Sequence, residues 1–171
     1  MLRLPLTLIG VSLGQVFYNR ASELHHQGKS MMPMINKMLI GIALFSLIPF
    51  GILFFYGEFL FAFVFGKEWG LAGSYSETMS IWLMLNFIFS PISALPLILR
   101  KQKVFFFMGI VSSLILVIPF WYFPWQYGRT PEVFHLCLQV VSYVQAAWLL
   151  VTIIIFYTYA LRASQAKDRK S

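Results

Sequence analysis

The chain has 171 residues, of which 59% are hydrophobic and only 11% are charged. Soluble domains typically contain about 45–50% apolar and about 25% charged residues, so this composition excludes a water-soluble globular fold and indicates a membrane protein. The formal net charge is +7, yet the basic residues lie in short segments between apolar stretches, which argues against a continuous nucleic-acid-binding face.

Five apolar stretches follow one another along the chain. We expect transmembrane helices over about 4–19, 38–56, 75–99, 104–123 and 133–161. The second stretch has 19 residues, and at about 1.5 Å per residue such a helix matches a hydrocarbon core of about 30 Å. The predicted fold is an all-α polytopic membrane protein of about five transmembrane helices. These helices form one domain, 1–161, and a basic cytoplasmic tail, 162–171, follows it.

Lysine and arginine are distributed unevenly between the segments that separate these stretches. Ten fall in one set of alternate segments, namely Arg20, Lys29, Lys37, Arg100, Lys101, Lys103, Arg162, Lys167, Arg169 and Lys170. Three fall in the other set, namely Arg3, Lys67 and Arg129. Because basic segments are retained on the cytoplasmic side during insertion, the pattern predicts an external amino terminus and a cytoplasmic carboxyl terminus.

Three of the predicted helices carry polar side chains at helical spacing. The stripes are Ser12, Gln15 and Asn19; Asn86, Ser90 and Ser93; and Gln139, Ser142 and Gln145. Polar groups in hydrocarbon are costly unless they are paired or hydrated, so each stripe should face another helix or water. Two interpretations stay open, namely hydrogen bonds that hold helices together and a hydrated path for a substrate. The candidate residues of such a path are Ser12, Gln15, Asn19, Arg20, Asn86, Ser90 and Gln139.

The connections between the stretches are short. The segment 57–74 is apolar up to Gly66 but too short to cross a membrane, so we expect a re-entrant or interface-lying segment there. Gly28, Ser30 and Pro33 indicate that the connection 20–37 is non-helical or starts a helix. Every acidic residue is expected in a loop, in the tail or near a helix end, so the sequence does not indicate a proton relay within the membrane.

Residues for catalysis or metal binding are not arranged in any recognisable pattern. The chain has no Ser-His-Asp set, no paired carboxylates within reach of each other and no phosphate-binding loop. The single cysteine, Cys137, and the adjacent His25 and His26 do not have the spacing of metal ligands. We therefore expect no enzymatic activity, no metal and no cofactor.

Two segments resemble a known family. The run PLTLIGVSLGQVFYNRAS at 5–22 and the run FVFGKEWGLAGSYSETMS at 63–80 resemble the carboxyl-terminal half of bacterial polysaccharide and O-antigen flippases. These flippases belong to the superfamily that also contains multidrug extruders. The more distinctive element reads F-G-x-x-W-x-x-A-G-x-Y, and its residues here are Phe65, Gly66, Trp69, Ala72, Gly73 and Tyr75. Beyond Leu99 the resemblance lies only in hydropathy and charge alternation.

The resemblance implies a transporter of two six-helix lobes in the bacterial cytoplasmic (inner) membrane. Such a transporter moves a lipid-linked oligosaccharide to the outer leaflet for polysaccharide or lipopolysaccharide synthesis. The last five of twelve helices would begin outside, which agrees with the orientation inferred from charge. We therefore expect this chain to be a carboxyl-terminal part of such a protein, with Arg20 either meeting phosphate or anchoring the topology.

The resemblance also implies the partners. They would be membrane lipid, the lipid-linked oligosaccharide, and either a missing amino-terminal half or polysaccharide-assembly proteins, with no nucleic acid. Two alternatives stay open. A drug or metabolite antiporter of the same superfamily would share the fold but would need ionisable residues inside its helices. A non-transporting membrane scaffold subunit would need no polar path.

Overall fold

The computed structural model describes the backbone of residues 3–27 and 29–168, and the side chains of residues 14–24, 26–27 and 29–165. These residues form helices joined by short connections, and none of them belongs to a strand. The predicted all-α fold class is confirmed for the described residues.

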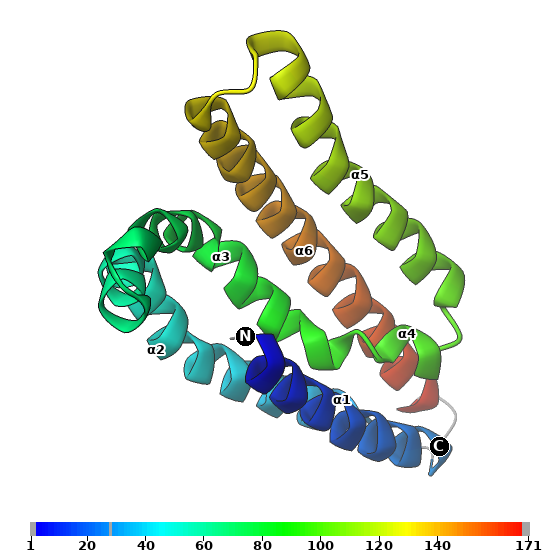
Figure 1. The fold of residues 1–171 in the computed structure, drawn as a ribbon. Helices are drawn as coiled ribbons and strands as arrows, with labels where there is room; N and C mark the ends of the chain where they lie inside the picture. Colours follow the sequence, from blue (N-terminus) through cyan, green and yellow to red (C-terminus); the bar gives the residue numbers. More distant parts are fainter. Residues whose placement is uncertain (1–2, 28, 169–171) are drawn as a thin grey trace.

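Six α-helices make up the described part of the chain (Figure 1). They are α1, Arg3–His26; α2, Met32–Phe65; α3, Gly70–Ile92; α4, Leu95–Ile98; α5, Gln102–Tyr127; and α6, Pro131–Asp168. A single 3-10 turn, Lys67–Trp69, joins α2 to α3. The central helix is α3, which contacts α1, α2 and α6, whereas α5 packs against α6 and α4.

Within the part of the chain that the structure describes, four helical segments are long and apolar enough to cross a membrane. They are Met32–Phe65, Lys67–Ile98, Gln102–Tyr127 and Pro131–Gln165. Their length and composition fit a membrane-embedded protein. The first expected span, 4–19, belongs to α1, but most of its side chains lie outside the described set, so the count of five stays a prediction.

The helices extend beyond the apolar stretches from which they were predicted. α1 continues past Asn19 to His26, so a large part of the expected connection 20–37 is helical. The helical range of α2 extends to Phe65, so residues 57–65 of the expected re-entrant or interface-lying segment are helical, and their placement in the membrane stays a prediction. Tyr56 has non-helical dihedral angles (φ −135°, ψ 20°), so a kink there divides α2 into two helical parts.

The connections gather at two ends of the bundle. Ser30 Oγ, between α1 and α2, lies 2.7 Å from Ser164 Oγ on α6, and Lys101 Nζ, between α4 and α5, lies 5.6 Å from the ring centre of Tyr159 on α6. We call this end the basic end. It carries Arg20, Lys29, Lys37, Arg100, Lys101, Lys103 and Arg162.

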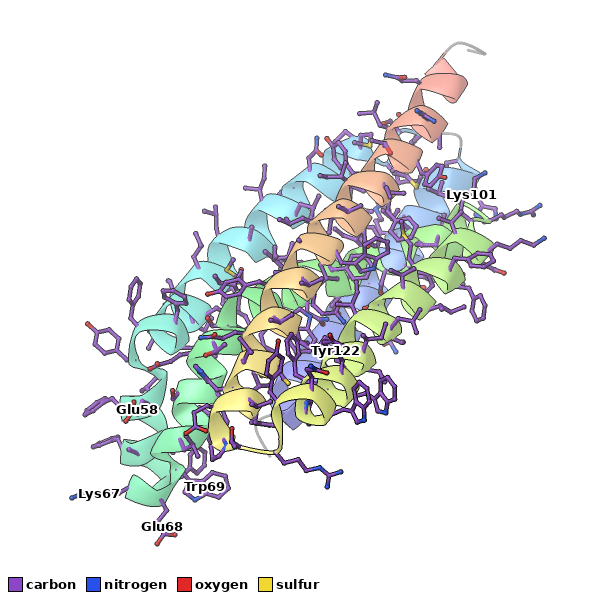
Figure 2. The ribbon with its side chains drawn as sticks, turned by 90° about the horizontal axis from the view of Figure 1, so that it is seen from above. Glu58, Lys67, Glu68, Trp69, Lys101 and Tyr122 are labelled. Atoms are coloured by element: carbon purple, nitrogen blue, oxygen red, sulfur yellow. The ribbon has the colours of Figure 1, made fainter. Side chains whose placement is uncertain are left out.

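The α2–α3 and α5–α6 connections lie toward the opposite end, where α3 and α6 meet and the ring centres of Tyr75 and Phe134 are 5.4 Å apart. Figure 2 shows Glu58, Lys67 and Glu68 at that end and Lys101 at the basic end. The alternation of lysine and arginine along the sequence thus becomes a separation in space. Which end faces the cytoplasm stays a prediction.

The main apolar core lies near the basic end and joins five helices, α1, α2, α3, α4 and α6, to the α1–α2 connection. Its buried members are Phe17, Ala21, Met31, Ile35, Ile92, Leu95, Phe156 and Ala160. Because Phe17 and Ala21 lie on one face of α1, this core fixes which face of α1 stays exposed.

Candidate functional site

A groove of about 610 Å³ opens between α1 and the segment where α3 ends and α4 begins. Its lining residues are Gly14, Gln15, Tyr18, Asn19, Ser90, Ser93, Ala94 and Leu97. The polar stripes of α1 and α3, far apart in the sequence, therefore meet at one surface. Among the candidate path residues, Gln15, Asn19 and Ser90 line this groove, which we call the α1–α3 groove.

Local sequence explains how the groove forms. Gln15, Tyr18 and Asn19 recur at steps of three and four residues, so they share a face of α1, while Phe17 on another face is only 2% exposed. The second wall of the groove is formed where α3 ends at Ile92. Pro91, one residue earlier, has no backbone N–H to donate to the helix.

Several polar side chains at this surface are unpaired. Gln15, Asn19 and Asn86 are exposed and have no hydrogen-bond partner among the side chains and backbone groups that the structure describes. Asn86 lies one helical turn before Ser90, so it extends the polar face of α3 beyond the groove. An unpaired amide in hydrocarbon costs several kcal/mol in order of magnitude, so this surface requires water, a polar ligand or a polar partner.

The polar stripe of α6 has a different environment. Ser142 Oγ donates to the carbonyl oxygen of Thr78 on α3 at 2.8 Å. Gln145 Nε2 donates to the carbonyl oxygen of Ser112 on α5 at 2.7 Å, and Ser112 Oγ donates to Gln145 Oε1 at 3.0 Å. Ser142 and Gln145 are 1% and 3% exposed. For these two residues, hydrogen bonding between helices is therefore the better interpretation.

Two further candidate residues do not reach the groove. Gln139 lies on α6, is partly buried and is not part of the groove lining. Ser12 belongs to α1, but its side chain lies outside the described residues.

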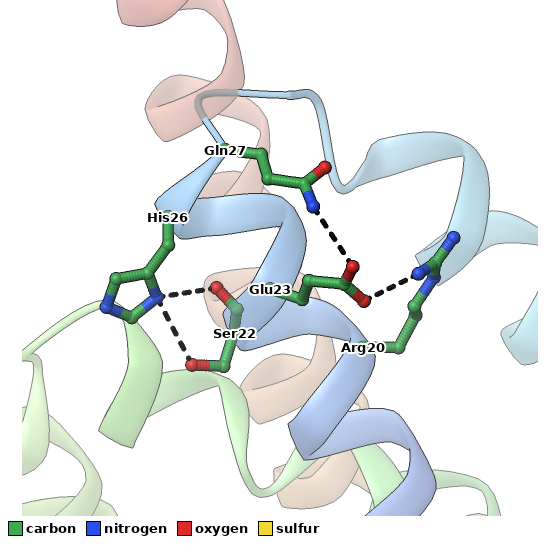
Figure 3. A network of polar contacts seen from close by, with 5 residues as sticks. All are labelled: Arg20, Ser22, Glu23, His26 and Gln27. Carbon is green, nitrogen blue, oxygen red and sulfur yellow. Dashed lines mark hydrogen bonds and ion pairs between the residues drawn. The ribbon is translucent and has the colours of Figure 1, made fainter.

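Arg20 follows Asn19 on α1 and is already paired. Its Nη1 atom lies 2.5 Å from Glu23 Oε2, and Gln27 Nε2 donates to Glu23 Oε1 at 3.0 Å (Figure 3). In the same turn, His26 Nδ1 lies 2.8 Å from the carbonyl oxygen of Ser22. Exposed ion pairs contribute about 0–1 kcal/mol, so an anionic ligand can compete for the guanidinium group at little cost. Arg20 adjoins the α1–α3 groove without lining it.

The residues of the family-like element shape the reversal between α2 and α3. The ring centres of Phe65 and Trp69 are 5.8 Å apart, and Gly66 has φ 106°, a conformation that side-chain-bearing residues rarely adopt. Tyr75 lies against Phe134, and its ring centre is 5.9 Å from that of His135. None of these residues lines the α1–α3 groove.

Gly73 of this element has a packing role of its own. A Cβ atom built on Gly73 would lie 2.6 Å from Glu58 Cα, so only glycine permits this approach of α3 to α2. Ala72, which completes the element, accepts a hydrogen bond at its carbonyl oxygen from Ser76 Oγ at 2.9 Å.

The structure also contains an acidic residue whose position the sequence analysis misjudged. Glu77 lies two turns inside α3 and accepts a hydrogen bond at Oε1 from the backbone N–H of Glu58, at 2.8 Å. Glu58 lies inside α2, just past the bend at Tyr56. The expectation that all acidic residues lie near helix ends is therefore wrong for Glu77, because α3 begins earlier than its apolar stretch. The signal that could have found it is its position as the one charge within the apolar stretch 75–99.

The chemistry that this surface can perform is binding. Amides and hydroxyls offer both donors and acceptors but no nucleophile with an adjacent base. Among the described residues, no three or more His, Cys, Asp or Glu side chains are grouped so that they could hold a metal ion.

Comparisons with family models, curated proteins and solved structures found no match to this chain. The flippase resemblance therefore stays an expectation that rests on the sequence elements given above.

Proposed function

We propose that the chain is part of a membrane transporter that translocates a lipid-linked oligosaccharide across the bacterial cytoplasmic membrane, for polysaccharide or lipopolysaccharide synthesis. The observation that carries this proposal is the α1–α3 groove. Its amides and hydroxyls lie toward the basic end of an otherwise apolar bundle, and Gln15 and Asn19 have no described partner.

The groove supplies what such a cargo needs in order to leave water. Sugar hydroxyls and phosphates cannot enter hydrocarbon unaided, because each unsatisfied polar group costs several kcal/mol in order of magnitude. The amides of Gln15 and Asn19 can donate and accept hydrogen bonds, and Arg20 beside them can form a charge-assisted bond with phosphate. The apolar tail of the cargo would stay in the surrounding lipid.

The position of the groove suits loading from the cytoplasm. By the positive-inside rule the basic end faces the cytoplasm, and Asn19, Ser93 and Leu97 lie toward this end of their helices. The groove would then open in the inner leaflet. A second lobe, as the family resemblance implies, would supply the facing wall and let the two lobes alternate around the cargo.

One alternative gains support from a single residue. A drug or metabolite antiporter needs an ionisable group inside a spanning helix, and Glu77 is such a group in α3. Glu77 lies toward the opposite end from the α1–α3 groove, where it accepts the backbone N–H of Glu58. Because the ionisable residue and the groove lie apart, the groove favours a transporter of a lipid-linked oligosaccharide over an antiporter that uses Glu77.

Thiol labelling tests whether the groove is hydrated. In a Cys137→Ser background, Gln15→Cys and Asn86→Cys should react with a small, membrane-impermeant thiol reagent. Two matched positions should not react: Gln145→Cys, which is buried between α5 and α6, and Leu47→Cys, which is 54% exposed on the apolar surface of α2. Equal, negligible labelling at all four positions would overturn the hydrated path.

Complementation tests the cargo. The chain, joined to or co-expressed with a seven-helix amino-terminal segment of a flippase, should restore surface polysaccharide in a flippase-deficient strain. The Asn19→Leu variant should abolish this restoration, while the Leu47→Ala variant should retain it. If labelling succeeds but the unaltered chain restores no polysaccharide, the groove is hydrated but the oligosaccharide cargo is wrong.

A further inference from the structure

The connection between α4 and α5 and the first turn of α5 carry three basic side chains within four residues, Arg100, Lys101 and Lys103. The Lys101 N–H donates to the carbonyl oxygen of Pro96 at 2.7 Å, and the Arg100 N–H donates to that of Leu97 at 3.3 Å. Such bonds end a helix when a residue just past its last turn has a left-handed backbone conformation. Here that residue is Arg100, with φ 53°, the one non-glycine residue with positive φ in the described chain. An arginine thus occupies a position where glycine is usual, on a defined turn.

Among the residues whose side chains the structure describes, these cations have no anionic partner. All three side chains are exposed, and the one ion pair among the described residues joins Arg20 to Glu23. Lys101 lies over the ring of Tyr159, which docks the turn against α6. Figure 2 shows Lys101 at the opposite end of the bundle from Glu58 and Glu68. The turn is therefore a site of uncompensated positive charge, which favours phosphate.

A second groove, about 480 Å³ in volume, lies on α5 just beyond this turn. Its lining residues are Phe105, Phe106, Gly109, Ile110, Ser113 and Leu114. A Cβ atom built on Gly109 meets nothing within 4 Å, so the missing side chain leaves open space between its larger neighbours. Ser113 Oγ donates to the carbonyl oxygen of Gly109 at 2.9 Å, which leaves the groove without an unpaired polar group.

Lys103 and this groove share one face of α5, and Arg100 and Lys101 directly precede that helix. Lys103 precedes Phe106 by three residues and Ile110 by seven, and these spacings place side chains in line along a helix. From Phe105 to Leu114 the groove follows the axis for about 14 Å, at about 1.5 Å per residue. The face is thus cationic at the helix end and apolar toward the helix middle. It complements an anionic phospholipid in one leaflet, which has a negative headgroup at the surface and apolar chains below it.

From this continuity we infer that α5 and the α4–α5 turn bind one anionic phospholipid. Arg100, Lys101 and Lys103 hold the headgroup phosphate, and an acyl chain lies beside Gly109. If inorganic phosphate were the ligand, the apolar groove would stay empty. If an apolar helix of a partner occupied the groove, the three cations would stay without a counter-charge. A phospholipid satisfies both halves of the site.

Native mass spectrometry of the full chain, released from detergent, tests this inference with phosphatidylglycerol, phosphatidylcholine and inorganic phosphate as probes. The unaltered chain should retain phosphatidylglycerol in preference to phosphatidylcholine. Each cation near an anionic headgroup contributes about fivefold in affinity, so the R100Q/K101Q/K103Q variant should bind phosphatidylglycerol about a hundredfold more weakly. Lys67→Gln, which removes one cation at the opposite end, is the control for position and should change nothing.

Filling the groove tests the acyl-chain half of the site. Gly109→Leu should fold, because the space is open, and should weaken phosphatidylglycerol binding about tenfold, as expected when roughly two methylene groups lose their burial. Gly41→Leu on α2 is the matched control, because a Cβ atom there also meets nothing within 4 Å.

Several outcomes would overturn the inference. They are equal retention of the two lipids, a triple variant that keeps the preference, equal effects of Gly109→Leu and Gly41→Leu, and complete displacement of the lipid by inorganic phosphate. If the triple variant does not fold, as judged by circular dichroism, Lys103→Gln alone replaces it. That single change should weaken phosphatidylglycerol binding about fivefold, and an unchanged affinity would count equally against the site.

Discussion

Two polar surfaces of the bundle use the same residue types in opposite ways. Where α6 meets α3 and α5, Ser142 and Gln145 are buried and hydrogen-bonded across helices. Where α1 meets α3, Gln15 and Asn19 are exposed and have no described partner. We call the first the paired surface and the second the open surface. The comparison shows that polar residues at helical spacing identify a polar face of a helix. The spacing does not show whether another helix packs against that face.

The difference follows from packing around α3. On one side, Gly57 and Gly73 let α2 approach α3 so closely that no Cβ atom fits between them. On another side, α6 packs along α3, and Ser142 reaches the backbone of Thr78. On the third side, α1 meets α3 close to the end of that helix at Ile92, and the groove remains. Helices that pack closely pair their polar groups, whereas the open surface leaves them for a ligand.

The largest effect should come from separating α2 and α3. We expect Gly73→Leu to lower the free energy of unfolding by about 3 kcal/mol or more, because the new side chain would displace the backbone of Glu58. Unfolding by dodecyl sulfate in mixed micelles measures this change. Gly51→Leu, at a position with nothing within 4 Å of an added Cβ atom, is the control and should be nearly neutral. Equal losses for both variants would mean that the close approach of α2 and α3 does not hold the bundle together.

A smaller effect should follow from removing the acceptor at the bend of α2. Glu77→Leu leaves the N–H of Glu58 without a partner, and hydrogen bonds to charged groups contribute about 1.5–3 kcal/mol. Glu77→Gln keeps an oxygen acceptor, so its loss in the free energy of unfolding should stay below about 1 kcal/mol. The same unfolding measurement compares the two. If Gln costs as much as Leu, the carboxylate acts through its charge and the antiporter alternative gains weight.

The sequence predicted the helical class, and three of its candidate path residues, Gln15, Asn19 and Ser90, line the α1–α3 groove, whose function stays a prediction. Hydropathy located each long helix, because an apolar run of this length has few other stable structures in a membrane. The spacing of Gln15 and Asn19, and of Asn86 and Ser90, identified polar faces correctly. It could not tell that Ser142 and Gln145 would be paired while Gln15 would not, because pairing depends on which helices become neighbours.

The limits of the helices were the least predictable feature. α1 continues through the charged residues Arg20 and Glu23, which pair with each other at a spacing of three residues and are compatible with a helix. Hydropathy ends a predicted span at the first charge, although the helix itself continues into the headgroup region or beyond. For the same reason Glu77 was expected near a helix end, and its contact with α2 was not foreseen.

On the paired surface, a moderate effect should follow from removing one amide. Gln145→Leu loses both hydrogen bonds to Ser112, and such bonds between membrane helices contribute about 0.6 kcal/mol on average and up to about 1.7. We expect a loss of about 1 kcal/mol in the free energy of unfolding. The double variant Gln145→Leu with Ser112→Ala should cost little more than Gln145→Leu alone, since the two side chains bond to each other. Additive losses would contradict the pairing of α5 with α6.

On the open surface, the corresponding change should have almost no effect on stability. Gln15→Leu removes an amide that has no described partner, so no hydrogen bond is lost, and leucine is at least as favourable as glutamine in a helix. In lipid the change should leave the free energy of unfolding within about 0.5 kcal/mol of the unaltered chain. Polysaccharide restoration by the chain with its facing lobe should nevertheless fall, because the groove loses a donor and an acceptor together. Gln15→Asn, which keeps the amide one methylene shorter, should retain part of that restoration. A large loss of stability in Gln15→Leu would show that the amide is paired after all, and the contrast between the paired and open surfaces would then fail.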